Sequence, residues 1–229
     1  MPRWTLSQRL IAFVTIPAAL LLLVFGWFRA DEPAQFFKEG GAVETVSVLL
    51  LAQGVLCWFA VHGRAGWRDW QIPAILVLFA MREMDFDKRF TESGVLKLRT
   101  YTGDAPLMLK LTGAAAILFS LWVIWRILAR NGPGWWRGLR AGRFPAVATL
   151  LAMVMVVFAK GLDGLGRKLL DVGIVISDGL DGHAGRIEEM LELAAWWLLA
   201  LAIARSPAAR AQEPRPKDGE DPARLPRRA

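Results

Sequence analysis

The sequence is poor in the residues from which most catalytic and metal sites are built. It contains one cysteine and two histidines among 229 residues. A single cysteine, Cys57, excludes an intrachain disulfide and a metal site made of paired cysteines. The sequence also contains no Walker motif and no G-x-G-x-x-G motif after a predicted strand, so neither of these nucleotide-binding sites is expected.

Long apolar runs are what the sequence has in excess. Hydrophobic residues make up 55% of the chain, against roughly 45–50% in soluble domains, and six stretches are almost free of charge. These stretches are residues 10–28, 43–61, 72–81, 111–125, 144–159 and 193–204. A membrane-spanning helix needs about 20 mostly apolar residues. The first two runs reach that length alone, and the other four need polar residues at their ends.

The apolar runs predict an all-α fold, a polytopic transmembrane helix bundle of about six spans within residues 1–204. We expect the spans near residues 10–28, 43–61, 70–86, 107–128, 144–161 and 187–204. Residues 205–229 are rich in proline, arginine and acidic residues, which predicts a disordered basic tail. The first run exceeds the about 7–15 apolar residues of a signal peptide and no A-x-A site follows it, so we expect a retained span.

The distribution of lysine and arginine predicts that both termini lie in the cytoplasm. With the N-terminus inside, the inner connections are residues 1–9, 62–70, 126–143 and 205–229. They hold 16 Lys/Arg and 5 Asp/Glu, whereas the rest of the chain holds 12 and 16. Because positive charge gathers on the cytoplasmic side of membrane proteins, an N-in, C-in arrangement is favoured. In a bacterium this indicates a multi-pass protein of the inner (plasma) membrane. His62 and His183 then lie on opposite sides and cannot share a metal.

The net charge of +7 points to a membrane surface rather than to nucleic acid, because most of the basic excess lies in the inner connections. The loop 131–144 has the composition of a membrane interface. It contains Trp135, Trp136, Arg137, Arg140 and Arg143. Tryptophan prefers the headgroup level and arginine is attracted to anionic headgroups. The expected partners are therefore the lipid bilayer and anionic lipid headgroups at the cytoplasmic face.

Charged residues also gather in three segments on the expected outer side, where the second and last spans begin and the third ends. Ionisable residues at such depths are costly and are normally paired. The residues expected to form a polar cluster are Glu44, Arg82, Arg89, Arg167 and Glu189. The candidates for acid/base or ligand chemistry are Glu83, Asp85, Asp87, Glu188 and Glu192.

Helical spacing predicts specific pairs within these segments. Arg82 and Asp85 are three residues apart and can pair on one helix, whereas Glu83 and Asp87 are four apart, repel each other and need a cation. At least one acidic residue of the last span is expected to turn toward an arginine such as Arg82 or Arg167.

One stretch resembles a known family. Residues 82–91 read R-E-M-D-F-D-K-R-F-T, and residues 97–101 read K-L-R-T-Y. This is similar to the R-E-L-D-F-H-K-x-F-T and K-x-R-x-Y elements of an uncharacterised family of proteobacterial polytopic inner-membrane proteins. The family's E-E-x-L-E element resembles residues 188–192. Asp87 stands where the family has histidine, so a ligand or base role of that histidine would not transfer. The resemblance implies a multi-pass membrane protein and no particular activity.

Three functions remain open. The favoured one is a structural or accessory membrane protein whose outer polar cluster fixes helix packing. The second is a membrane-embedded enzyme acting on a lipid or envelope substrate, with carboxylates as acid/base groups or as ligands of a divalent cation. The third is an ion-coupled carrier with a carboxylate relay. The third is less favoured because Lys110 is the one charge in a span interior and is expected near an end.

Overall fold

The computed structural model describes residues 6–30, 36–37, 41–86 and 98–206. As the sequence predicts, this part of the chain is helical and contains no strand. The long helices are α1 (Leu6–Arg29), α3 (Ala42–His62), α4 (Gln71–Glu83), α6 (Leu107–Arg130), α8 (Phe144–Leu162) and α10 (Asp178–Ala204). Shorter helical segments lie between them: η1 (Gly63–Asp69), α5 (Leu98–Thr102), α7 (Gly132–Arg140) and α9 (Leu165–Leu170).

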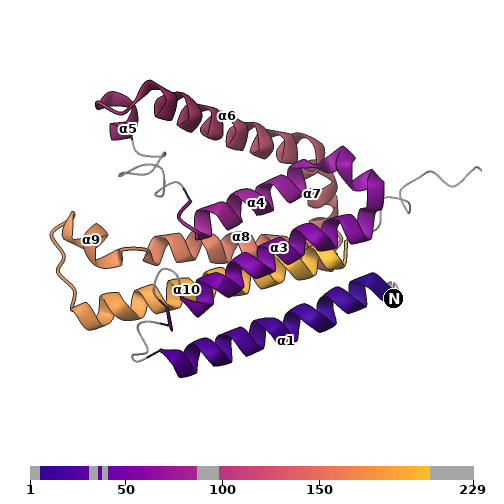
Figure 1. The fold of residues 1–229 in the computed structure, drawn as a ribbon, viewed down its shortest axis with the longest axis horizontal. Coiled ribbons are helices and arrows are strands. Elements are labelled where there is room, and N and C mark those ends of the chain that lie inside the picture. Colours follow the sequence, from indigo (N-terminus) through magenta and orange to yellow (C-terminus); the bar gives the residue numbers. More distant parts are fainter. Residues whose placement is uncertain (1–5, 31–35, 38–40, 87–97, 207–229) are drawn as a thin grey trace, which may run out of the picture.

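The long helices run up and down along one axis of the bundle (Figure 1). α1, α4 and α8 run from the end that holds η1 and α7 toward the end that holds α9, and α3, α6 and α10 run back. We call these two ends the α7 end and the α9 end. α3 packs against α1, α4 and α10, and α10 packs along α8. α6 lies at the edge of the bundle and packs against α4 and α7.

Within the described residues, three helical segments are long and apolar enough to cross a membrane: Ala42–Asp69, Leu107–Arg130 and Phe144–Leu162. α6 exposes apolar side chains around much of its circumference, among them Leu118, Leu121, Trp125 and Leu128. An exposed apolar surface of this extent is unfavourable in water and indicates contact with lipid or protein. At about 1.5 Å per residue, the 13 residues of α4 are shorter than the hydrocarbon core of a bilayer.

Two helix ends and one connecting segment differ from those expected from the sequence. α4 ends at Glu83 instead of continuing to residue 86, and α10 begins at Asp178 instead of near residue 187. Ser177 sets the earlier start of α10, because its hydroxyl oxygen accepts a hydrogen bond from the backbone N–H of Leu180 at 3.3 Å. The segment expected as an interfacial loop contains helix α7, whose N-terminal proline and C-terminal arginines both favour a helix.

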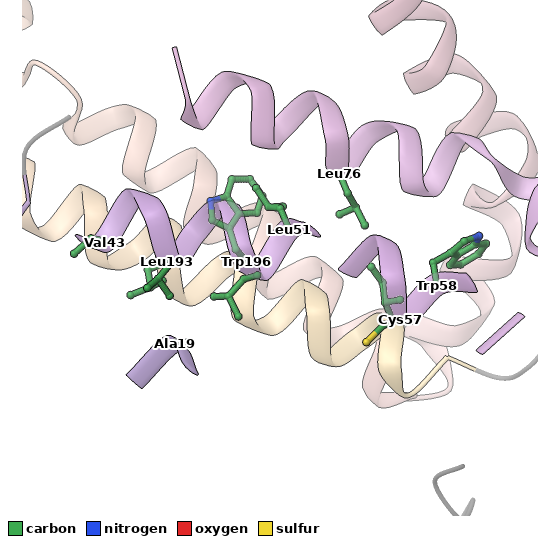
Figure 2. Packing of buried hydrophobic residues seen from close by; sticks show 11 residues of the cluster. Ala19, Val43, Leu51, Cys57, Trp58, Leu76, Leu193 and Trp196 are labelled. Atoms are coloured by element: carbon green, nitrogen blue, oxygen red, sulfur yellow. The ribbon is translucent and has the colours of Figure 1, made fainter. Parts of the chain in front are cut away.

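The hydrophobic core is built around α3 (Figure 2). Leu50 and Cys57 of α3 are buried together with Leu76 of α4 and Trp196 of α10, and Ala19 of α1 closes the opposite side. Because α3 contributes buried side chains toward three neighbours, it is the central helix of the bundle.

Small residues bring α8 and α10 close together. The buried residues of α8 are all alanines: Ala146, Ala148, Ala152 and Ala159. The facing helix, α10, buries four more: Ala184, Ala195, Ala200 and Ala202. Interfaces of small residues let helix backbones approach closely in a membrane, where the hydrophobic effect does not drive helices together. The close approach also decides which polar residues of α8 can reach α10.

We predict that Ala152→Leu destabilises the protein. Ala152 is 3% exposed, so a larger side chain must push α8 away from α10, and such overpacking typically costs about 1–3 kcal/mol. The melting temperature of the protein in detergent would therefore fall. The matched control is Ala115→Leu on the exposed surface of α6, which should leave it unchanged. An equal effect of both substitutions would contradict the tight α8–α10 contact.

Candidate functional site

Five charged side chains from three helices meet at the α9 end of the bundle. Arg82 and Glu83 end α4, Lys160 lies in the last turn of α8, and Glu188 and Glu192 lie on α10. We call these five residues the charged cluster. Figure 1 shows why they meet: α4 and α8 end, and α10 begins, at this end of the bundle.

Glu192 is the centre of the charged cluster. Its Oε1 atom lies 3.0 Å from Nζ of Lys160 and 3.5 Å from Nη1 of Arg82. One carboxylate oxygen therefore contacts cations from both α8 and α4. The side chain of Glu192 is only 6% exposed, and attraction between opposite charges is screened much less in a buried site than in water. Glu192 thus joins three helices electrostatically.

Lys160 is a cation of the charged cluster that the sequence analysis did not predict, because it expected arginines to pair with the acidic residues. Its Nζ donates hydrogen bonds to Oε1 of Glu188 at 2.9 Å and to Oδ2 of Asp163 at 3.4 Å, besides contacting Glu192. A lysine can reach such a site because its apolar stem packs among the helices while the ammonium group lies at their ends. The signal in the sequence was its position. Lys160 directly follows the apolar run 144–159, and in the structure its ammonium group contacts the acidic residues of α10.

Arg82 contacts two carboxylates. Its Nη1 donates to Oε1 of Glu83 at 3.2 Å and lies 3.5 Å from Glu192, so the predicted approach to an acidic residue of the last helix is present. Glu83 is almost fully buried, whereas Arg82 is close to half exposed. The predicted Arg82–Asp85 pair assumed that both residues lie on one helix. They do not, because α4 ends at Glu83 and Asp85, beyond that end, adopts a φ of 46°.

The other residues expected in the cluster are placed differently. Glu189 lies near enough to Glu44, Glu188 and Glu192 for electrostatic repulsion. Arg167 forms no ion pair within the part of the chain that the structure describes, and its guanidinium group lies beside Gly164. Two further predicted residues, Asp87 and Arg89, lie outside the described residues.

The helix dipole does not explain the carboxylates of α10. The acidic residues of its first turn are Asp178 and Asp181, and the effect of the dipole falls off within that turn. Glu188 and Glu192 lie further along the helix, one turn apart on the side that faces Lys160. Their position is therefore explained by the cation of α8.

The geometry favours charge pairing over metal coordination. In the described ranges, no group of three or more His, Cys, Asp or Glu side chains is arranged to hold a metal ion. The carboxylates of Glu83, Glu188 and Glu192 are directed instead to a guanidinium and an ammonium group. Such an arrangement can hold helices together, and neighbouring carboxylates can also share protons.

A second polar network lies at the α7 end, and the sequence reasoning missed it. Gln71 is fully buried at the start of α4. Its Nε2 donates to Oδ1 of Asp69 at 3.0 Å and to Oδ1 of Asn131 at 2.8 Å, and its Oε1 accepts from Nε of Arg126 at 2.9 Å. Both ends of the amide are therefore satisfied. This network ties α4 to the end of α6, and a lone glutamine beside an apolar run was its main signal in the sequence.

Comparison with known proteins adds no family assignment. No protein-family model, no curated protein and no solved structure matches this chain.

Proposed function

We propose that the chain is a six-span protein of the bacterial inner membrane, with both termini in the cytoplasm and a structural or accessory role. In this proposal the charged cluster fastens α4, α8 and α10 on the periplasmic side. The observation that carries it is the contact of Glu192 with cations from both neighbouring helices. The alternating direction of the long helices supports six crossings (Figure 1).

The segregation of charge between the two ends of the bundle supports the orientation. The elements of the α7 end carry eight arginines and one acidic residue, Asp69, within the described residues. The arginines are Arg64, Arg68, Arg126, Arg130, Arg137, Arg140, Arg143 and Arg205. The acidic residues of the described chain otherwise lie toward the α9 end. Basic residues remain on the cytoplasmic side during insertion, which puts the α7 end in the cytoplasm.

A structural role for the cluster follows from the cost of breaking it. Buried ion pairs add little stability compared with apolar residues, but removing one partner leaves an uncompensated buried charge, which costs about 3–5 kcal/mol. Loss of Lys160 would leave Glu188 without its cation and Glu192 with Arg82 alone. The attraction between α8 and α10 at this end would then be lost, and Glu188 would be left as a partly buried charge without a partner.

We therefore predict that Lys160→Met strongly lowers the melting temperature and the amount of folded protein in the membrane. Lys110→Met is the matched control, because it removes the same charge from α6 outside the cluster; its Nζ bonds one backbone carbonyl, that of Gly103. Lipid composition of the membrane should be measured in parallel. A Lys160→Met protein that folds normally would contradict the structural role, and a changed lipid species in that case would favour an enzyme.

The orientation can be tested with single cysteines, because Cys57 is buried and can be replaced. In a Cys57→Ala background we predict that Val175→Cys, which is 81% exposed between α9 and α10, reacts with a membrane-impermeant maleimide in spheroplasts. Gly134→Cys on α7 should react only in inverted vesicles. The reverse pattern would mean that the α7 end faces the periplasm.

We further propose that α7 lies in the cytoplasmic headgroup layer. The indole N–H of Trp135 donates to the backbone carbonyl of Ala146 at 3.1 Å, which fixes α7 on α8. Trp136 is about half exposed, and the guanidinium of Arg140 lies 5.3 Å from the centre of its ring. Exposed tryptophan and arginine together suit the interface and anionic headgroups.

This placement predicts that phosphatidylglycerol stabilises the protein through α7. In nanodiscs of phosphatidylcholine with and without phosphatidylglycerol, the anionic lipid should raise the melting temperature. The double variant Arg137→Gln/Arg140→Gln should lose most of that gain, since each basic residue near such a surface contributes about 1 kcal/mol. Arg64→Gln/Arg68→Gln removes equal charge from the same end and should keep the gain. Equal losses would point to net charge alone.

A further inference from the structure

The charged cluster holds more negative than positive charge. Three carboxylates, Glu83, Glu188 and Glu192, face two cations, Arg82 and Lys160. With the cations of the described residues, full ionisation would leave one negative charge uncompensated in a site where two of the carboxylates are less than one-tenth exposed. A buried charge without a partner is costly, and a carboxylate in such a place takes up a proton instead.

Glu83 is the least compensated carboxylate of the three. Glu192 has cations at 3.0 and 3.5 Å, and Glu188 accepts a hydrogen bond from Lys160 at 2.9 Å. Among the described residues, Glu83 has an ion pair with Arg82 alone, at 3.2 Å. That guanidinium is shared with Glu192 and is 45% exposed, whereas Glu83 is 4% exposed. Glu83, the most buried of the three carboxylates, is therefore the one whose negative charge is least neutralised.

Two buried polar atoms beside this site have no hydrogen-bond partner among the described residues. One is Oε1 of Glu192, whose contact with Lys160 is close but lacks hydrogen-bond geometry, and the other is the indole Nε1 of Trp196. Trp196 lies one turn after Glu192 on α10 and is 2% exposed. Its ring nitrogen is on the side toward Val43, which is the α9 end of the bundle (Figure 2). The indole N–H is therefore an unpaired donor among the described residues, on the side of the ring that faces the end of the bundle with the charged cluster.

The hydrogen bonds of Gln71 provide a comparison for the unpaired atoms of Glu192 and Trp196. Gln71 is also fully buried, and both ends of its amide are paired. Buried polar groups are nearly always paired in native proteins, and an exception asks for a specific occupant such as water or a proton. The same fold therefore satisfies one buried network with its own side chains and leaves the other incomplete.

We propose that the charged cluster is a proton-binding site, in which one proton resides on Glu83 and is shared with Glu192. A water molecule that accepts from the N–H of Trp196 and donates to Oε1 of Glu192 completes the hydrogen bonds. The added proton cancels the excess negative charge of the charged cluster. A proton suits this site better than a metal cation, because Arg82 and Lys160 already lie within 3.5 Å of Glu192 and would repel a second positive ion.

This inference rests on the proposed function in one respect, because it requires the charged cluster to fold as described. Charged groups from every neighbouring helix act on the site, and all of them enter its titration. Among the described residues they are Glu44 of α3, Arg82 of α4, Lys160 of α8, Asp163 just after α8, and Glu188, Glu189 and Glu192 of α10. Two of the remaining acidic groups, Glu44 and Glu189, add negative charge, which favours proton uptake further.

The sign of the pH effect follows from this stoichiometry. If Glu83 holds a proton in the folded protein and ionises in the unfolded chain, the folded state binds one more proton near neutral pH. The free energy of unfolding then falls as the pH rises, and the unfolding equilibrium constant increases about tenfold per pH unit. The fall stops once the folded protein also releases the proton.

Infrared spectroscopy of the full chain in phosphatidylcholine nanodiscs tests the proposal directly. The wild-type protein should show the carbonyl stretch of a protonated carboxyl group at neutral pH, which disappears reversibly at high pH. Glu83→Gln should abolish that band and flatten the dependence of stability on pH. Asp163→Asn is the matched control, since Asp163 also contacts Lys160 but is half exposed, and it should leave the band in place.

A wild-type protein without the protonated carboxyl band at neutral pH would overturn the proposal, whatever the variants do. A band that survives both Glu83→Gln and Glu192→Gln would overturn it too, by placing the proton elsewhere. Substituting sodium for potassium should change nothing, and a band lost only in sodium would mean that a metal cation competes for the site. The melting temperature of Lys160→Met tests the structural role separately, so the two ideas can fail independently.

Discussion

Glu192 places one carboxylate oxygen within reach of a lysine from α8 and an arginine from α4. The arrangement depends on the apolar packing beneath it. The buried residues of α8 are alanines, and α10, which packs along it, buries four more. Small side chains let helix backbones approach closely, which brings Lys160 within reach of Glu188 and Glu192. In return, the ion contacts hold the ends of three helices together. The charges and the small residues are therefore parts of one interaction.

The two ends of the bundle solve the problem of buried polar groups in different ways. At the α7 end, Gln71 pairs both halves of its amide with neighbouring side chains. At the α9 end, the charged cluster has one more carboxylate than cations, and atoms of Glu192 and Trp196 are left without hydrogen bonds among the described residues. The first network serves to hold α4 against α6. The second also holds helices together, but its incomplete pairing gives it the capacity to take up a proton.

Much of the helix layout could be predicted from the sequence. Apolar runs mark the long helices because side chains in those runs are buried or face lipid. The acidic residues of the last helix, and Arg82, were predicted to meet because buried charges must pair. The ends of the helices were harder to predict. α4 ends at Glu83 and α10 begins at Asp178 because local capping and turn geometry, rather than hydrophobicity, decide where a helix stops. Arg167 was chosen as a partner, whereas Lys160 is the residue that the packing selects.

The sequence by itself determined that the chain is helical, that it contains long apolar runs, and that basic and acidic residues are concentrated in different connections between those runs. Those properties are local, because each depends on residue type and spacing along one segment. Only the tertiary structure decided which charges meet. Lys160 and Glu192 are distant in sequence, and their 3.0 Å contact exists because α8 and α10 pack along each other. Which carboxylate lacks a full partner is likewise a property of three helices together, because compensation depends on distance and burial rather than on the count of charges.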